Sequence, residues 1–263
     1  ALRTLLAPTA FAGEIPQIDL AVGDEGAARA VVHYLGVDRA ALADLLRQLT
    51  DDSLDVLIKT GRKNPLYPVR GHGELRIEVD QPPIKLTCAA GGFAQINLQQ
   101  NRQLVDSVIK TADLRGKERI LDLYCGMGNF SLPLARRAAW VCGVENSAPS
   151  IDMAKRNAEL NLLEHVEFHS RPAEGALSFF SRQDSFDVVL LDPPRAGAHA
   201  VMQELLKNPV PRVIYVSCDP QTLARDLKSL LQGGYRLVSS QPFDLFPQTY
   251  HVESLTLLEY RAA

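Results

Sequence analysis

One cysteine stands where its thiol could act as a nucleophile. Cys218 follows a strand-like run, Val213 to Val216, and Asp219-Pro220 after it leads into a helix-like run, Gln221 to Leu231. The free N–H groups and the positive pole of a helix N-terminus favour the thiolate, which is the reactive form of cysteine. We therefore expect Cys218 to be a catalytic nucleophile.

A glycine-containing loop upstream has the features of a cofactor site. Asp122 ends a strand-like run, and Gly126 and Gly128 allow the backbone to turn tightly before a helix that is predicted to start at Asn129. A G-x-G pattern alone is weak evidence and is also found in plain strand-to-helix turns. Here Ser131 replaces the third glycine of a dinucleotide fingerprint, and a carboxylate suits a cationic sulfonium or ammonium better than a pyrophosphate.

The next strand-like run also ends in a carboxylate. Glu145 follows Gly143-Val144, a position from which a carboxylate can accept hydrogen bonds from both hydroxyls of a ribose. S-adenosylmethionine accounts for Asp122 and for Glu145, whereas NAD accounts for Glu145 only. The two carboxylates therefore favour S-adenosylmethionine as the cofactor.

A third loop, Asp192-Pro-Pro-Arg195, follows another apolar strand-like run. Two prolines directly after a strand impose a rigid extended exit, which would fix Asp192 against a ligand. The simpler interpretation is a strand terminator with an N-capping aspartate. A similar loop in amino-methylating enzymes carries an aromatic residue that stacks the base, and Arg195 makes such stacking doubtful. The loop has no cysteine, so Cys218 remains the candidate nucleophile.

Composition indicates a globular chain of one large or two modest domains. It has 263 residues, of which 46% are hydrophobic and 22% charged, and its formal net charge is -3. No run approaches the roughly 20 apolar residues of a membrane span, and no secretory signal is visible, so we expect a cytoplasmic protein without a membrane partner. The four cysteines lack metal-site spacing, which predicts neither a metal nor a disulfide framework in this chain.

The second part of the chain alternates strands with amphipathic helices. Asn97 is predicted to cap the first of these helices, and an apolar strand recurs about every 20 to 25 residues. The predicted strands are Arg119 to Leu123, Trp140 to Val144, Val166 to His169, Asp187 to Leu191 and Val213 to Val216. This alternation predicts an α/β fold with a doubly wound, mostly parallel sheet, whose ligands bind beyond the carboxyl ends of the strands.

The first part predicts a small α+β domain over residues 1–92, followed by the larger domain over residues 93–263. A helix is expected from Asp38 to Leu49, with strands over Leu54 to Ile58, Leu75 to Val79 and Ile84 to Thr87. A basic segment between the first two of these strands is more simply a solvated loop, and becomes a phosphate contact only if the larger domain acts on RNA. Its candidate contacts are Lys59, Arg62, Lys63 and Arg70.

Five motifs, taken in order, resemble the signature set of the bacterial RNA (uracil-5-)-methyltransferases. They are Phe93-Ala-Gln-Ile-Asn97, Asp122-Leu-Tyr-Cys-Gly-Met-Gly-Asn-Phe130, Asp192-Pro-Pro-Arg-Ala-Gly197, Ser217-Cys-Asp-Pro-Gln-Thr-Leu-Ala-Arg-Asp226 and Asp244-Leu-Phe-Pro-Gln-Thr-Tyr-His-Val-Glu253. The resemblance is strong from about Phe93 to Tyr260 and faint before it. It implies a Rossmann-like class I methyltransferase fold and the formation of 5-methyluridine in ribosomal or transfer RNA.

The resemblance also implies residue roles. Cys218 would add to C6 of uracil, and Glu253 would be the general base; without the family, the run before Glu253 would suggest an edge strand with an exposed carboxylate. Phe93 and Arg195 would contact the substrate. The positions matching cofactor contacts are Gln95, Asp122, Tyr124, Gly126, Gly128, Asn129, Glu145 and Asp192.

Two parts of the family are missing from the chain, namely an N-terminal nucleic-acid-binding barrel and the four-cysteine iron–sulfur segment of many members. We therefore expect a C-terminal fragment, monomeric, with residues 1–92 forming part of an RNA-binding central domain. The wording of the third and fourth motifs resembles the 23S-directed branch more than the transfer-RNA branch, which makes ribosomal RNA the expected partner. The alternatives are a methyltransferase of transfer RNA, of another base or of protein, and an RNA-binding module that has lost catalysis.

Overall fold

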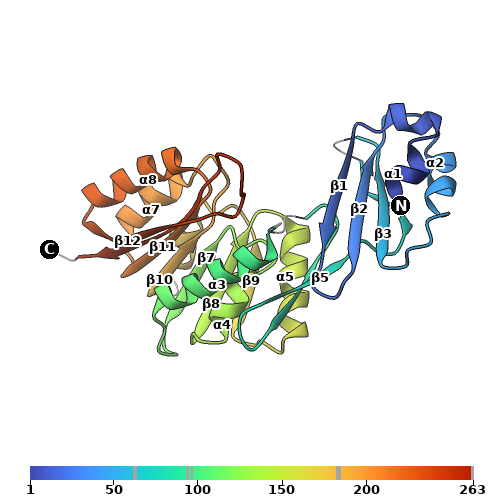
Figure 1. The fold of residues 1–263 in the computed structure, drawn as a ribbon. Coiled ribbons are helices and arrows are strands. Elements are labelled where there is room, and N and C mark those ends of the chain that lie inside the picture. Colours follow the sequence, from blue (N-terminus) through green and yellow to red (C-terminus); the bar gives the residue numbers. More distant parts are fainter. Residues whose placement is uncertain (62–63, 93–94, 96, 182–184, 262–263) are drawn as a thin grey trace. The chain divides into compact units, whose positions relative to one another are not determined.

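A computed structural model describes residues 1–61, 64–92, 95, 97–181 and 185–261. The chain forms two compact units (Figure 1). The first unit comprises residues 1–77 and 87–94, and the second comprises residues 78–86 and 95–263. The boundary predicted from the sequence lies between residues 92 and 93, whereas the chain last passes from the first unit to the second between residues 94 and 95. The sequence analysis did not separate residues 78–86 from the first unit. Within the described residues, no helix is long and apolar enough to cross a membrane.

The first unit is a four-stranded sheet in the order β1-β2-β3-β4, with helices packed on its apolar side. β2 and β3 run parallel, because helix α2 connects them, while β1 and β4 run antiparallel to their neighbours. Asp38 begins α2 by accepting a hydrogen bond from the backbone N–H of Ala41. Its elements are α1 Leu2–Leu6, a 3-10 helix Ala10–Glu14, β1 Gln17–Val22, β2 Ala28–His33, α2 Arg39–Leu46, β3 Leu54–Lys59 and β4 Tyr67–Arg70.

A hairpin, β5 Leu75–Val79 and β6 Ile84–Cys88, leads from the first unit into the second and back. Its tip is held within the second unit by Asp80, whose side chain is almost fully buried. The guanidinium groups of Arg136 and Arg137 both bind this carboxylate, with N–O distances of 3.2 and 2.6 Å. These ion pairs explain why residues 78–86 belong with the second unit.

The second unit has a seven-stranded sheet in the order β12-β13-β11-β10-β7-β8-β9. The five strands from β11 to β9 run parallel, and β13 runs antiparallel between β11 and β12. The sheet elements are β7 Arg119–Leu123, β8 Trp140–Glu145, β9 Val166–Ser170, β10 Val188–Leu191, β11 Arg212–Ser217, β12 Tyr235–Phe243 and β13 Glu253–Tyr260. The expected α/β class with a mostly parallel sheet is therefore confirmed.

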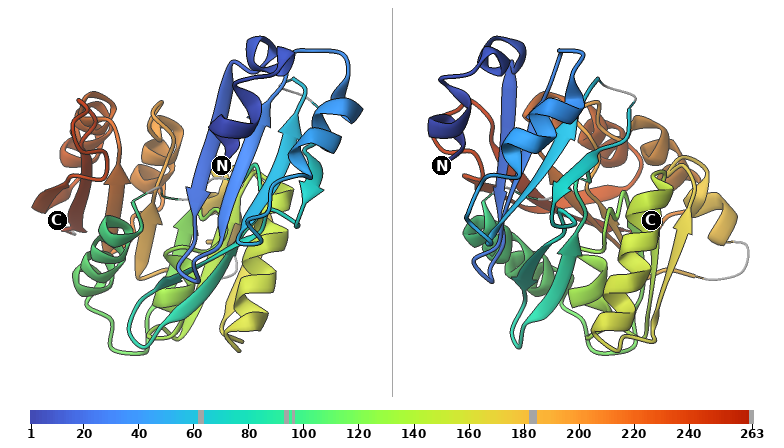
Figure 2. Two further views of the ribbon diagram at one scale, coloured as in Figure 1. Left: turned by 45° about the vertical axis from the view of Figure 1, so that its right-hand side comes forward. Right: turned by 90° about the vertical axis from the view of Figure 1, so that its right-hand side faces the viewer.

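Helices lie on both faces of this sheet (Figure 2). α3 packs with α4, while α6, α7 and α8 form a second packed group, as right-handed crossovers of a doubly wound sheet require. Asn97 caps α3 as predicted, accepting a hydrogen bond from Gln100 N–H at 3.2 Å. The helices are α3 Leu98–Ala112, α4 Ser131–Ala135, α5 Ala148–Leu160, α6 Ala176–Phe180, α7 His199–Lys207 and α8 Pro220–Gln232.

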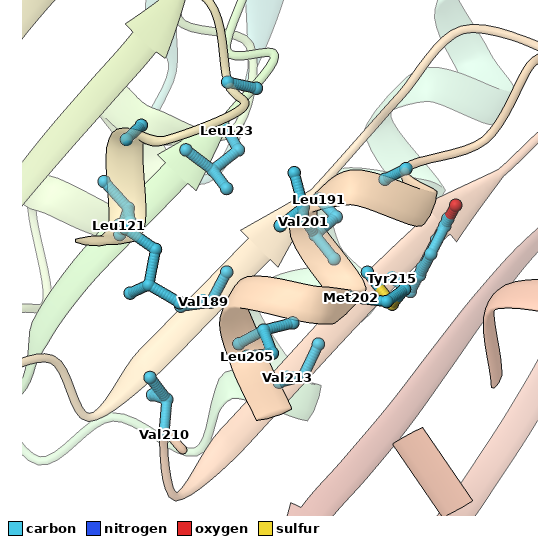
Figure 3. Close-up of a cluster of buried hydrophobic side chains, with 14 of the residues drawn as sticks. Leu121, Leu123, Val189, Leu191, Val201, Met202, Leu205, Val210, Val213 and Tyr215 are labelled. Atoms are coloured by element: carbon cyan, nitrogen blue, oxygen red, sulfur yellow. The ribbon is translucent and has the colours of Figure 1, made fainter. Parts of the chain in front are cut away.

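One buried core of the second unit lies between the sheet and the α6–α8 helices (Figure 3). Leu121 and Leu123 of β7 and Val189 and Leu191 of β10 face Met202 and its neighbours on α7. All of these side chains are fully buried. Because side chains alternate between the faces of a strand, this packing fixes which way each strand end points its polar residues.

Candidate functional site

The loops that carry the sequence motifs meet at the carboxyl ends of the parallel strands. β7, β8, β10 and β11 are neighbours or near neighbours in the sheet, and each ends in one of the singled-out residues or just before it. Asp122 lies on β7 and Glu145 ends β8, while Asp192 and Cys218 directly follow β10 and β11. A set of carboxylates and one thiol is thereby gathered at a single edge of the sheet.

Asp122 is a buried carboxylate with an unused acceptor. The residue is 0% exposed, and one of its oxygens accepts a hydrogen bond from the Ser131 hydroxyl. The other, Oδ1, has no hydrogen-bond partner among the described residues. Burial, with a smaller contribution from the Glu145 carboxylate, raises the pKa of Asp122 to about 7. Ser131 occupies the place of the third glycine in a dinucleotide fingerprint, and its hydroxyl contacts the aspartate.

The loop after Asp122 turns with left-handed backbone. Tyr124, Gly126 and Gly128 have φ angles of 65°, 54° and 94°. A Cβ added at Gly126 would meet no atom within 4 Å, so the glycine leaves open space above the loop. The amide of Asn129 forms two reciprocal hydrogen bonds of 2.9 and 3.0 Å with the buried amide of Asn101 on α3. This pair fixes the end of the loop, and no sequence motif had pointed to Asn101.

Hydrogen bonds hold Glu145 and Tyr124, two of the cofactor candidates, whereas a third candidate, Gln95, keeps an unused acceptor among the described residues. One carboxylate oxygen of Glu145 accepts the Ser147 N–H at 2.8 Å, at the start of α5. The Tyr124 hydroxyl lies 3.4 Å from a carboxylate oxygen of Glu174, another residue to which no sequence motif had pointed. Gln95 is buried, and its Oε1 has no partner in the part of the chain that the structure describes.

The antiparallel strand β13 brings Glu253 to the thiol. Ser217 of β11 pairs with Ser254 of β13, and the Ser254 hydroxyl donates to the Ser217 carbonyl at 3.2 Å. The next residues outward from this pair are Cys218, directly after β11, and Glu253, the first residue of β13. The two functional candidates therefore sit side by side although they are far apart in the sequence.

Glu253 is buried, in contrast to the interpretation of its segment as an edge strand. It is 3% exposed, its Oε1 has no partner within the described residues, and burial raises its pKa to about 7. The edge position belongs to β12, which shields β13 from that side. A buried carboxylate with a pKa near neutrality can hold or release a proton at physiological pH.

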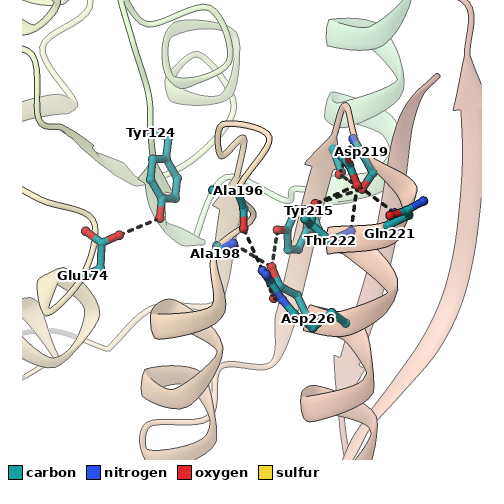
Figure 4. Close-up of polar contacts among 11 residues, drawn as sticks. Tyr124, Glu174, Ala196, Ala198, Tyr215, Asp219, Gln221, Thr222 and Asp226 are labelled. Atoms are coloured by element: carbon teal, nitrogen blue, oxygen red, sulfur yellow. Dashed lines mark hydrogen bonds and ion pairs between the residues drawn. The ribbon is translucent and has the colours of Figure 1, made fainter. Parts of the chain in front are cut away.

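The pKa of Cys218 is raised, so the expectation of a favoured thiolate is not met. Partial burial is the main cause, and the carboxylates of Glu253 and Asp192 add to it, while the Arg195 guanidinium opposes them. The helix N–H groups that were expected to help are already used. Asp219 accepts the N–H groups of Gln221 and Thr222, each at 2.9 Å (Figure 4).

Asp192 is the third coupled carboxylate. Removal from water raises its pKa well above the usual value, and the negative charges of Glu253 and Asp122 raise it further. Its backbone N–H donates to the Leu123 carbonyl at 3.3 Å, which ties the loop after β10 to the end of β7. Asp192 thus interacts electrostatically with both Asp122 and Glu253, and each of these three carboxyl groups has a raised pKa.

A buried aspartate anchors the loop after β10 to helix α8 (Figure 4). Asp226 accepts the Ala198 N–H at 2.7 Å and the Tyr215 hydroxyl at 2.8 Å, and it pairs with the Arg225 guanidinium. Arg225 in turn donates to the Ala196 carbonyl at 2.9 Å. This network fixes the Asp192 loop relative to the helix that follows Cys218. Asp226 ended one of the recognised motifs, but no role had been given to it.

The residues predicted to contact the substrate differ in their exposure and in their side-chain partners. The Arg195 side chain is exposed and lies 3.1 Å from His251 Nε2. In the first unit, Arg70 binds the Leu49 carbonyl and pairs with Asp52 at 2.8 Å, so its guanidinium is engaged inside the unit rather than free for phosphate. Lys59 ends β3 and is partly exposed. Phe93, Arg62 and Lys63 lie outside the described residues.

No group of three metal-binding side chains is found in the portion of the chain described by the structure. The candidate site consists of the Cys218 thiol, the Glu253 carboxylate, which can bind a proton, and further carboxylates that can accept hydrogen bonds from a cationic ligand. The basic loop belongs to the other unit. Its contribution to RNA binding stays a prediction.

Comparison with solved structures agrees with the fold. A tRNA (uracil-54, C5)-methyltransferase from Pyrococcus abyssi, solved with S-adenosyl-L-homocysteine, matches with a TM-score of 0.73 and 29% identity, over 92% of this chain and 59% of that one. A tRNA m1G37 methyltransferase from M. jannaschii has a TM-score of 0.62 at 14% identity, over 97% of this chain and 78% of that chain, and supports the fold alone. The expected Rossmann-like methyltransferase fold is confirmed.

Sequence comparison identifies the family. A 23S rRNA (uracil(1939)-C(5))-methyltransferase from Methylococcus capsulatus is 41% identical over 93% of this chain and 56% of its own length, and the one from Vibrio parahaemolyticus is 36% identical over 94% and 55%. The chain spans about half the length of these relatives. The family model described as tRNA (uracil-5-)-methyltransferase matches residues 36–261. This chain therefore belongs to the tRNA (uracil-5-)-methyltransferase family.

Proposed function

We propose that this chain carries the catalytic site of an enzyme that methylates C5 of a uridine in RNA, with S-adenosylmethionine as methyl donor. The observation that carries the proposal is the β11–β13 register, which sets the Cys218 thiol beside the buried Glu253 carboxylate. A nucleophile and a general base are the two groups that this reaction demands. Family membership supports the same conclusion.

The residues at the carboxyl ends of the parallel strands fit the proposed cofactor. Asp122 Oδ1 and Gln95 Oε1 are buried acceptors without partners among the described residues, and they suit the ammonium group of an amino acid. The open space at Gly126 leaves room for a ligand beside the backbone. Glu145 would accept hydrogen bonds from the ribose hydroxyls. Tyr124, Asn129 and Asp192 would complete the cofactor site.

The chemistry explains why a thiol is needed. C5 of uracil is a weak nucleophile until the Cys218 sulfur forms a bond to C6, which places the negative charge on O4 and electron density on C5. When bound, S-adenosylmethionine supplies an electrophilic methyl group for this activated carbon. Glu253 then removes the remaining proton from C5, and the electron pair expels the Cys218 thiolate to restore the C5–C6 double bond.

The charges of the site suit this sequence of proton movements. A raised pKa equips Glu253 to accept a proton near neutral pH, as a general base should. The negative charge of ionised Glu253 raises the pKa of Cys218 and so disfavours the thiolate. A protonated Glu253 therefore favours the addition of the sulfur to C6, whereas an ionised Glu253 is needed to remove the proton from C5. Arg195 favours the thiolate in both cases.

We propose ribosomal RNA as the substrate and residues 1–92 as part of an RNA-binding domain. The curated relatives named above are 23S rRNA methyltransferases. Transfer RNA is the second candidate, because the solved relative of 29% identity is a tRNA (uracil-54, C5)-methyltransferase. In the first unit, Lys59 supports phosphate contacts better than Arg70, whose guanidinium is engaged by Asp52.

The test is methyl transfer from labelled S-adenosylmethionine to unmodified 23S rRNA and, separately, to unmodified tRNA, followed by nucleoside analysis. We expect 5-methyluridine in the 23S rRNA, and none with Cys218→Ala, while calorimetry finds unchanged cofactor affinity for that variant. Cys88→Ala is the control, since Cys88 lies in the first unit. Retained turnover by Cys218→Ala would show that Cys218 is not the nucleophile. A methylated nucleoside other than 5-methyluridine would show that C5 of uridine is not the site of methylation.

A further inference from the structure

A cluster of one exposed and two half-buried aromatic side chains borders the candidate site. The Tyr250 and His251 rings lie 4.2 Å apart, and the Phe246 ring lies 5.9 Å from that of His251. The Arg195 guanidinium contacts His251 Nε2 at 3.1 Å. We call these four residues the aromatic platform. Tyr250 is 88% exposed, so most of its ring is open to solvent.

The aromatic platform is continuous with the nucleophile and the base. Its aromatic members lie in the connection from β12 to β13, and Glu253 begins β13 two residues after His251. Arg195 follows Asp192 in the loop after β10. The positive charge of Arg195 also opposes the rise in the pKa of the Cys218 thiol. Two separate loops thus meet beside the thiol.

The exposed ring of Tyr250 is linked to a cation through His251, whose ring it contacts and whose Nε2 contacts the Arg195 guanidinium. Burial of an aromatic ring is favourable, and an exposed one gains little in the folded protein unless a partner covers it. Single-stranded RNA is bound by stacking its bases on aromatic rings and by contacts between its phosphates and cationic side chains. Here the Arg195–His251 contact and the ring contacts hold the group in place before any ligand binds.

We propose that the aromatic platform stacks the base of a nucleotide next to the target uridine, with Tyr250 as the stacking ring and Arg195 as the contact to its phosphate. This inference rests on the proposed function, because a flipped uridine at Cys218 places its neighbours at the rim of the site. The neighbouring nucleotide then offsets part of the free energy of unstacking the target.

The test compares RNA binding by the unaltered chain and by three variants, Tyr250→Ala, Tyr250→Phe and Leu162→Ala. Leu162 is the matched control: it is also 88% exposed, but it lies between α5 and β9, at the opposite edge of the sheet. The ligand is a labelled single-stranded RNA of one uridine within adenosines. Two further RNAs each carry one abasic residue, directly before the uridine in one and directly after it in the other. Affinity is measured by fluorescence anisotropy.

We expect Tyr250→Ala to weaken binding of the intact RNA by roughly 5- to 100-fold, the range of one base stacked on an aromatic ring. Tyr250→Phe and Leu162→Ala should bind within about twofold of the unaltered chain, because the ring is kept or the site is untouched. With one of the two abasic RNAs, the effect of Tyr250→Ala should disappear, since the base that stacks is gone.

Three outcomes would overturn the inference: equal affinity of Tyr250→Ala and the unaltered chain, an equal loss with all three RNAs, or no RNA binding at all. The proposed function is tested separately by methyl transfer. If the unaltered chain forms 5-methyluridine and Tyr250→Ala binds RNA equally well, the aromatic platform is refuted and the proposed function stands. If binding depends on Tyr250 and on the adjacent base but no methyl is transferred, the aromatic platform stands and the proposed function fails.

Discussion

Replacing Glu253 by glutamine should stabilise the fold while it removes catalysis. The carboxylate is 3% exposed, and burial raises its pKa from 4.5 to about 7. That increase in pKa corresponds to about 3 kcal/mol of destabilisation when the group is ionised in the folded protein. Glutamine has a similar shape and carries no charge, so the variant avoids this destabilisation.

The sign follows from proton binding in the two states. Below pH 4.5, Glu253 is protonated in the folded and the unfolded chain, and it contributes no pH dependence. Between pH 4.5 and 7 the unfolded chain loses the proton while the folded one keeps it, so stability falls as pH rises. Above pH 7 both are ionised, and the full difference of about 3 kcal/mol is present. Glu253→Gln should therefore stabilise the chain strongly at pH 8 and little at pH 4.5.

The assay is urea unfolding of both proteins at several pH values from 4.5 to 9. Glu259→Gln is the control on the same strand, because Glu259 forms an exposed ion pair with Arg236 and should shift stability by less than about 1 kcal/mol at every pH. A stability difference between Glu253→Gln and the unaltered chain that does not change with pH would refute the reasoning. In the methylation assay, the same variant should accumulate a covalent protein–RNA adduct that survives denaturation.

Three further changes test the site from other directions. Glu145→Ala should weaken S-adenosylmethionine binding by about 1–3 kcal/mol, the range for hydrogen bonds to a charged group, and unchanged affinity by calorimetry would exclude Glu145 from the cofactor site. Asp226→Ala should lower the free energy of unfolding by about 3–5 kcal/mol, because it strands a buried hydroxyl and an N–H group; a urea midpoint equal to that of the unaltered chain would contradict this. Asp219→Ala should lower the pKa of Cys218, because it frees two helix N–H groups and removes a negative charge, and the pH dependence of thiol alkylation should then move to lower pH.

Local sequence signals were sufficient for much of the second unit. The strand over Arg119–Leu123 has its predicted bounds, and Asn97 caps α3 as expected. Apolar periodicity and capping act over a few residues, so they can be recognised without knowing the rest of the fold. The same rules did not find β1, β2 and β4 in the first unit: β1 is mostly exposed, β2 is buried along most of its length, and β4 has only four residues, so none shows a regular alternation of buried and exposed positions.

The properties of the catalytic candidates required the tertiary structure. A helix start after Cys218 is visible in the sequence, but the pKa of the thiol is raised mainly by its burial in the fold and further by Glu253 and Asp192, which other strands bring close. The segment before Glu253 suggested an exposed edge strand because its own pattern is compatible with one. Strand order decided otherwise, since β12 takes the edge and β13 is enclosed beside β11.

The sequence by itself determined which chemical groups this chain has and that most of them follow strands, because residue type and local periodicity are written along the chain. Only the tertiary structure decided which groups are neighbours and how they are charged. The contact between the Cys218 and Glu253 strands, the anchoring of the Asp192 loop by Asp226, and the engagement of Arg70 by Asp52 all join residues distant in sequence. Such contacts depend on burial and packing of the whole sheet, which no local pattern encodes.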